Sequence, residues 1–275
     1  MTDSSSFPEV DHFRDESEAL YDLLAPLDDD AFQQATQFKS WTLHDVVAHL
    51  HIFNYAADLS MQDGDAFTAW YADLGKQMAG GKTLVQATED WLDAEESGAK
   101  NRNLLDVWRG FYLGFAARAA QQDPKKRVKW AGPDMSVRMS ITARLMETWA
   151  HGQEVYDHLG VERQDTDRIH GIATLGVKTY GWTFINRMLE VPQPAPYVRL
   201  TAPSGAIWEW NEPQENNHVT GSATEFCQVV TQTRSFADTK LEAVGDPATK
   251  WMSIAQCFAG PPEDPPKPGT RCIAV

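Results

Sequence analysis

The chain changes its pattern of apolar and polar positions near residue 191. From residue 9 to about residue 190, apolar side chains recur every three or four positions, which is typical of helices that each bury one face. The sequence Thr42 to Asp45 resembles a capping box that begins one of these helices, and Gly160 is a natural end for another. The pattern predicts helices over about 9–27, 43–59, 64–78, 83–96, 101–121, 137–159 and 166–190.

The segment PQPAP, residues 192–196, forms a stiff connector to a region of different character. Beyond it, YVRLTA, AIWEWN and HVTGSA alternate as strands do, whereas ATEFCQVVTQTR and PATKWMSIAQCF are typical of helices. We therefore predict the α+β class, with a helical domain at 1–191, a small α+β domain at 197–260 and a proline-rich surface tail at 261–275.

The charge and the apolar content of the chain limit the kinds of molecule that it is expected to bind. The chain has 24 basic and 39 acidic residues, and its net charge of -15 would repel nucleic acid and anionic membrane surfaces. No stretch approaches the roughly 20 apolar residues of a membrane span, and MTDSSSFPEV lacks the features of a signal peptide. We expect a cytoplasmic protein, a monomer or homodimer, that binds a small-molecule substrate but neither nucleic acid nor membrane.

Three histidines lie within WTLHDVVAHLHIF, residues 41–53. On a helix, His49 and His51 differ by about 200° and cannot share one site. His44 lies in the first turn, where we expect it to be exposed, while His49 lies beside Phe53 on the inward face. An inward histidine is either a buried hydrogen-bonded residue or a metal ligand, and the second interpretation needs a partner elsewhere.

The segment METWAHGQEVYDHLG, residues 146–160, offers such a partner. Glu147 and His151 are four residues apart, so their side chains lie on one helix face within about 6 Å and are able to bind one divalent ion. Glu154 and His158 extend the same polar stripe. The stripe is either a metal-binding face turned toward the centre of a bundle or a solvated face with charge pairs. Its apolar neighbours favour the first, because an unpaired buried carboxylate is costly.

The motifs W-T-x-x-D-V-x-A-H-L and M-E-T-W-A-H-G-Q-E-V together resemble the DinB-like superfamily, specifically its mycothiol-dependent maleylpyruvate isomerase-like branch. The resemblance implies an up-down-down-up four-helix bundle with a small C-terminal domain. It also implies a divalent metal, usually zinc (Zn²⁺), held by His49, Glu147 and His151. Glu154 stands where relatives often have Asp. In the isomerase branch, a metal-bound cofactor thiol such as mycothiol adds to an unsaturated acid, allows rotation about the former double bond, and leaves.

Two further residues are candidates for the site. Arg144, three residues before Glu147, is able either to bind a substrate carboxylate in a bidentate manner or to form an ion pair with Glu147. Trp130, in the loop WAGPDMS, resembles a segment shared with close relatives and either borders the cofactor pocket or is a hydrophobic anchor.

Three functions remain open from the sequence. The leading hypothesis is a metal-dependent enzyme of the thiol-dependent isomerase or S-transferase type, which activates a thiol or water on zinc to act on a small organic substrate. The alternatives are a zinc-dependent hydrolase with Glu154 as the general base, and a non-catalytic metal-containing protein that binds or carries a ligand. The sequence contains neither a recognisable nucleophile elbow with a Ser/His/Asp set nor a glycine-rich phosphate-binding loop, which argues against serine hydrolases and nucleotide enzymes.

Overall fold

The structure is a computed structural model that describes residues 7–96 and 98–274. It is mostly helical with two small sheets, so the predicted α+β class is confirmed. Contacts between residues divide the chain into two compact units, Met1–Gly152 and Gln153–Val275. The boundary at residue 191 stays a prediction of domain organisation. Among the helices of the described residues, none combines the length and apolar character needed to cross a membrane.

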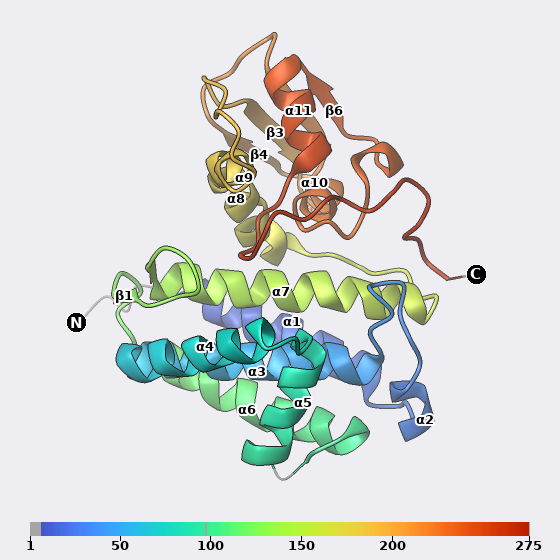
Figure 1. Ribbon diagram of the computed structural model, residues 1–275. Helices are drawn as coiled ribbons and strands as arrows, with labels where there is room; N and C mark the ends of the chain where they lie inside the picture. Colours follow the sequence, from blue (N-terminus) through green and yellow to red (C-terminus); the bar gives the residue numbers. More distant parts are fainter. Residues whose placement is uncertain (1–6, 97, 275) are drawn as a thin grey trace, which may run out of the picture. The chain divides into compact units, whose positions relative to one another are not determined.

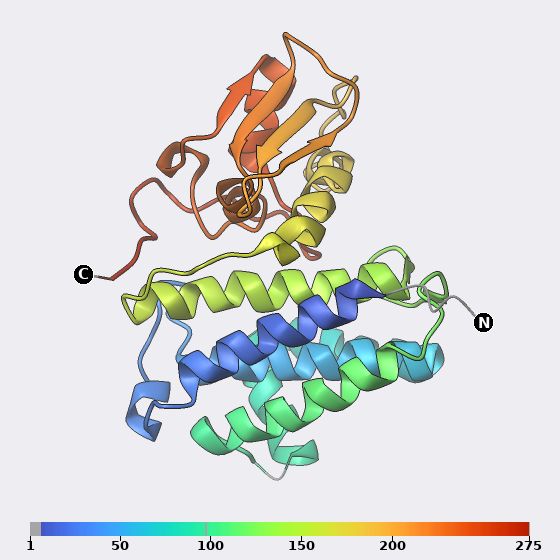
Figure 2. The ribbon, with the colours of Figure 1, turned by 180° about the vertical axis from the view of Figure 1, so that it is seen from behind.

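The first unit is built from helices that share one apolar core. Its elements are α1 (Pro8–Leu24), α2 (Asp29–Phe32), α3 (Leu43–Gln62), α4 (Gly64–Ala79), α5 (Leu84–Glu95), α6 (Asn101–Ala119), the short strands β1 (Arg127–Val128) and β2 (Met135–Ser136), and α7 (Val137–His158), within which the unit ends. In Figures 1 and 2, α1, α3, α6 and α7 lie side by side. Helix α6 packs against both α1 and α3, and α3 also packs against α4 and α5. Large fully buried side chains fill the centre, among them Phe13, Trp108, Tyr112, Phe115 and Trp149.

Local sequence determines where α3 begins. The Thr42 hydroxyl accepts a hydrogen bond from the backbone N–H of Asp45 (3.1 Å), and the Asp45 carboxylate accepts one from the backbone N–H of Thr42 (2.8 Å). This confirms the predicted capping box, which satisfies two of the free N–H groups at a helix start. The cap fixes the register of α3, and therefore the face on which His49 lies.

The second unit contains a four-stranded sheet. Its elements are η1 (Asp167–Ile169), α8 (His170–Lys178), α9 (Tyr180–Ile185), β3 (Tyr197–Thr201), β4 (Ile207–Trp210), β5 (His218–Ser222), α10 (Ala223–Val230), η2 (Phe236–Asp238), β6 (Glu242–Val244) and α11 (Asp246–Ile254). The strand order is β4-β3-β5-β6, with β3 and β5 parallel and the other pairs antiparallel. The three predicted strands are confirmed, while β6 and the β1–β2 pair are additional. In β3, Val198 and Leu200 are buried, and α10 packs against this strand and β5.

The prediction of a single helix over 166–190 is wrong. The chain instead forms η1, α8 and α9, and regular helix ends at Ile185. At the break, the Thr179 hydroxyl lies 2.8 Å from the carbonyl oxygen of Leu175 and 3.0 Å from that of Gly176. Such local side-chain bonds compete with the helical ladder. Farther along, Met188 takes a positive φ of 56°, which a helix cannot contain.

Two described residues of the predicted tail at 261–275 bond to the C-terminal part of α7. The Arg271 guanidinium pairs with the Glu154 carboxylate (2.7 Å), and the backbone N–H of Ala274 donates to the carbonyl of Asp157 (2.7 Å). The predicted stop at Gly160 is confirmed, since this residue takes a φ of +67° just beyond α7. A side chain there would also approach the carbonyl oxygen of Ala274 to 3.0 Å.

Candidate metal centre

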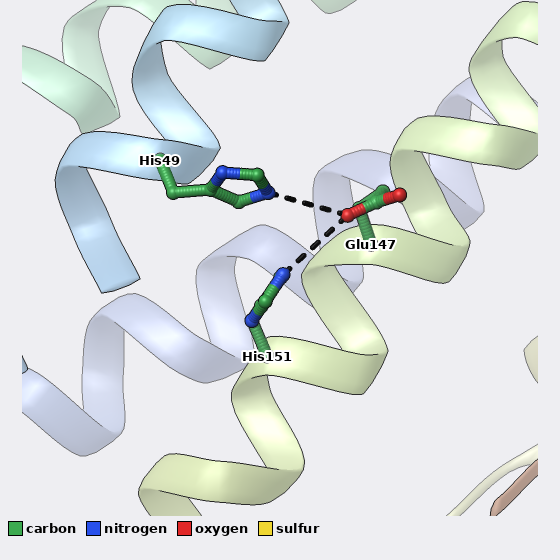
Figure 3. A group of neighbouring side chains, drawn as sticks. All are labelled: His49, Glu147 and His151. Atoms are coloured by element: carbon green, nitrogen blue, oxygen red, sulfur yellow. Dashed lines mark hydrogen bonds and ion pairs between the residues drawn. The ribbon is translucent and has the colours of Figure 1, made fainter. Parts of the chain in front are cut away.

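Three side chains from two helices converge in the first unit. His49 comes from α3, whereas Glu147 and His151 come from successive turns of α7 (Figure 3). Oε2 of Glu147 lies 3.3 Å from Nε2 of His49 and 3.5 Å from Nε2 of His151. One ligand atom from each residue lies within 4.8 Å of the other two, and no other such group of His, Cys, Asp and Glu occurs in residues 7–96 and 98–274. The trio is therefore compact enough to hold one ion.

The trio is largely shielded from solvent. The side chains of His49, Glu147 and His151 are 12%, 18% and 12% exposed, so each keeps limited contact with solvent. Trp41 stacks on His151, with ring centroids 5.6 Å apart and planes 10° apart, and it also lies 5.2 Å from His49. The ring centroid of Phe53 lies 4.8 Å from that of His49. These aromatic rings restrict the imidazoles to orientations in which both Nε2 atoms face Glu147.

Burial and mutual interactions determine the charge state of the trio. Burial opposes ionisation of Glu147, but hydrogen bonds from His151 and His49 and the nearby Arg144 charge hold the pKa of this carboxyl well below its usual range. Burial, together with repulsion from His151, lowers the pKa of His49 to about 4. Near neutral pH the site thus presents a carboxylate and a neutral His49 imidazole, which are the forms that bind metal ions.

The donor set fits a divalent metal. Two imidazole nitrogens and one carboxylate oxygen are ligands that zinc accepts, and three protein ligands leave a position open for water or substrate. The Nδ1 atom of His49 is buried and has no hydrogen-bond partner among the described residues. A hollow of about 10 Å³ lies beside His49 toward α5, bordered by Trp41 and Thr88 and not by Glu147 or His151, and has room for roughly one water molecule. His49, Glu147 and His151 are the residues that would hold the ion.

Arg144 lies at the edge of this group. Its Nη2 is 3.9 Å from Oε1 of Glu147, and its side chain is only 4% exposed. The guanidinium lies over the rings of Phe53 and Trp130, at 5.8 and 5.5 Å from their centroids. Trp130 in turn stacks on Phe67, with the planes 8° apart. Both sequence candidates, Arg144 and Trp130, therefore belong to one group of packed side chains next to the trio.

The remaining sequence candidates lie in other environments. Glu154 belongs to the second unit and pairs with Arg271, and the group able to share an ion contains neither Glu154 nor His158. His51 points away from His49, as the helical geometry predicted, and its Nε2 lies 3.1 Å from Glu96. The expectation that His44 is exposed is wrong. It is 6% exposed, because α5 and the start of α6 cover it.

Sequence reasoning missed the aromatic rings that surround the trio. Trp41 and Phe38 both contact His151, and both precede α3 in a loop without periodic pattern. A usable signal existed for Trp41, because it directly precedes the capping box, where an apolar side chain often packs back on the helix. No comparable signal marks Phe38.

The fold and the trio define a helical protein with a candidate metal centre, and comparisons with known proteins give its family. A family model described as the mycothiol maleylpyruvate isomerase N-terminal domain matches residues 13–156. Two uncharacterized proteins from two strains of Mycobacterium tuberculosis are 36% identical over 255 residues, which cover 93% of this chain and 96% of each relative. The chain therefore belongs to the mycothiol maleylpyruvate isomerase N-terminal domain family, within the DinB-like superfamily.

A solved structure shares the fold at low sequence identity. The crystal structure of the mycothiol-dependent maleylpyruvate isomerase superimposes with a TM-score of 0.50 and 17% identity, covering 80% of this chain and 86% of that one. At this identity the likeness concerns the fold alone. The similarity extends past residue 156, where the match to the family model ends.

Proposed function

We propose that this protein is a divalent-metal-dependent enzyme of the thiol-dependent isomerase or S-transferase type, acting on a small organic substrate. The observation that carries the proposal is the convergence of His49, Glu147 and His151 within 4.8 Å in a chain of this family. The thiol is of low molecular weight, with mycothiol as the first candidate, and the metal is zinc. A zinc ion at an open site lowers the pKa of a bound thiol or water and so supplies a nucleophile near neutral pH.

The residues of the chain have distinct roles in this proposal. His49, Glu147 and His151 hold the ion, and Trp41 keeps the His151 ring in place by stacking. Arg144 and Trp130 pack next to the trio, where the guanidinium would provide positive charge beside the reacting groups. The same helices, α1, α3, α6 and α7, are proposed to form an up-down-down-up four-helix bundle. The packing of α6 against α1 and α3 and the approach of His49 to Glu147 support that arrangement.

The hydrolase alternative has less support. It requires Glu154 as a general base, but the Glu154 carboxylate pairs with Arg271 at 2.7 Å and is 3% exposed. In this position the carboxylate is held by a guanidinium and shielded from solvent, so it is poorly placed to take a proton from water. For the carrier alternative, the hollow beside His49 has room for only about one water molecule and is too small for a stored ligand.

Metal analysis of the purified protein tests the proposal. The wild type is expected to carry close to one equivalent of zinc, and His151→Ala to lose it, because two protein ligands bind zinc far more weakly than three. His158→Ala, seven residues later on the same helix and outside the trio, is the matched control and should retain the metal. Negligible metal in the wild type would remove the basis of the proposal.

Activity assays then separate the remaining functions. The zinc-loaded protein is assayed with maleylpyruvate and mycothiol, and with glutathione as a second thiol. Thiol-dependent isomerisation or adduct formation supports the proposal, whereas turnover without any thiol supports a hydrolase. Retention of ligand without product would indicate a carrier.

A further inference from the structure

The two oxygens of the Glu147 carboxylate face different groups. Oε2 lies toward Nε2 of both His49 and His151, whereas Oε1 lies 3.9 Å from Nη2 of Arg144. A guanidinium attracts the oxygen that it faces, and this attraction resists any rotation that would bring both oxygens toward the imidazoles. The carboxylate is thus divided between a metal-facing oxygen and an arginine-facing oxygen.

The buried guanidinium of Arg144 is incompletely paired. Its Nε and Nη1 atoms are buried and have no hydrogen-bond partner in the described part of the chain. Arg138, on the same helix, is 46% exposed and pairs with Glu9 at 2.7 Å. An incompletely paired buried guanidinium destabilises the fold, so its presence beside Glu147 calls for a functional reason.

We propose that Arg144 is a positioning residue of the metal centre, which holds Glu147 to a single-oxygen contact with the ion and weakens ion binding through its own positive charge. This inference rests on the proposed metal-dependent function. Single-oxygen contact leaves more coordination positions for a thiol or substrate. By drawing charge from Glu147, Arg144 would also make a thiol held at the centre more acidic, which would compensate for the weaker metal affinity.

Cobalt(II) is the probe for this proposal, because its visible absorption reports coordination number. Metal-free full-length protein is titrated with Co²⁺ as wild type, Arg144→Met and Arg144→Lys. Removing the charge in Arg144→Met should tighten Co²⁺ binding at least about tenfold, since a like charge near the ion is lost. It should also shift the spectrum toward the weaker absorption of a higher coordination number, because Oε1 becomes free to bind. Arg144→Lys retains the charge and should keep the affinity within about threefold of wild type.

Arg138→Met is the matched control, which should leave both affinity and spectrum unchanged. Equal or weaker Co²⁺ binding by Arg144→Met, with an unaltered spectrum, would overturn the inference and leave the proposed function standing. A wild type that binds no Co²⁺ would overturn both. If circular dichroism shows that Arg144→Met does not fold, Arg144→Gln decides. It removes the same positive charge and should also tighten Co²⁺ binding, so equal or weaker binding would count against the proposal.

Discussion

Helix α3 carries three histidines that each meet a carboxylate, yet only one of them belongs to a candidate metal centre. Nε2 of His44 lies 2.7 Å from Glu89, and its Nδ1 accepts a hydrogen bond from the backbone N–H of Asn101. His51 likewise faces a single carboxylate, that of Glu96. His49 differs because its carboxylate is shared with a second imidazole. A histidine–carboxylate pair is thus common on this helix, and the convergence of a third ligand is what distinguishes the site.

Neutralising each of the three carboxylates in turn tests most directly whether the three histidine–carboxylate pairs differ in zinc binding. Glu147→Gln should weaken Zn²⁺ binding at least about 1,000-fold, roughly 4 kcal/mol, because it removes the one charged ligand of the trio. Glu89→Gln and Glu96→Gln should leave the zinc affinity unchanged. Competition with a chromophoric chelator measures all three. A loss of affinity in the two control variants as large as in Glu147→Gln would show that the three pairs are equivalent.

Replacing each of the two histidines on opposite faces of α3 by alanine should separate the effect on folding stability from the effect on zinc affinity. His51 is fully buried against the rings of Trp91 and Phe111, so His51→Ala should lower the free energy of unfolding by about 2–3 kcal/mol and leave zinc affinity intact. His49→Ala should abolish tight zinc binding but lower the free energy of unfolding of the metal-free protein by only about 1 kcal/mol, since its surroundings are less completely packed.

Urea denaturation in the presence of a chelator measures the stability of both variants, and calorimetric zinc titration measures their affinity. We expect His51→Ala to change mainly the stability and His49→Ala mainly the zinc affinity. If both substitutions changed stability and affinity in proportion, the loss of zinc would be a consequence of unfolding, and His49 would not be a ligand.

The comparison also shows which parts of the site the sequence could predict. Helical spacing placed Glu147 and His151 on one face and separated His49 from His51, because these relations depend only on the geometry of a single helix. That His49 of α3 meets α7 depends on packing between segments about a hundred residues apart, and only the family resemblance suggested it. The exposure of His44 was mispredicted for the same reason, since its cover comes from α5 and the start of α6.

The fold was predictable to a similar extent. The strands β3, β4 and β5 were found because alternation and a turn mark them, whereas the three-residue β6 is too short to carry a pattern. The break at Thr179 depends on a side-chain hydrogen bond that competes with the helix, and apolar periodicity does not register such a bond. The ion pair between Glu154 and Arg271 joins residues 117 positions apart and could not be read from the local pattern.

Glu18, in the same unit, is a third kind of carboxylate, because its charge is compensated by an arginine and not by a histidine. Glu18 accepts hydrogen bonds from Arg109 (3.0 and 2.8 Å) and from the hydroxyl of the buried Tyr112 (2.6 Å). The Arg109 hydrogen bonds, with that of Tyr112, lower the pKa of Glu18 below its usual value of 4.5. Glu18 needs no metal, so its role should be confined to stability.

The pH dependence of that role follows from the sign of the shift. Because the pKa is lower in the folded protein, ionised Glu18 contributes stability above pH 4.5, and the contribution is lost as the pH falls through the folded pKa. Glu18→Gln should lower the free energy of unfolding by about 1 kcal/mol at pH 7, a modest value because the pair is partly exposed. The difference from wild type should shrink below pH 4.5, and zinc affinity should not change.

Urea denaturation across pH 3–7 measures this difference in the free energy of unfolding, with Asp15→Asn, at an exposed position, as the control variant. A difference that stays constant with pH would mean that the charge of Glu18 does not contribute, and a change in zinc affinity would show that compensated carboxylates and the trio are coupled.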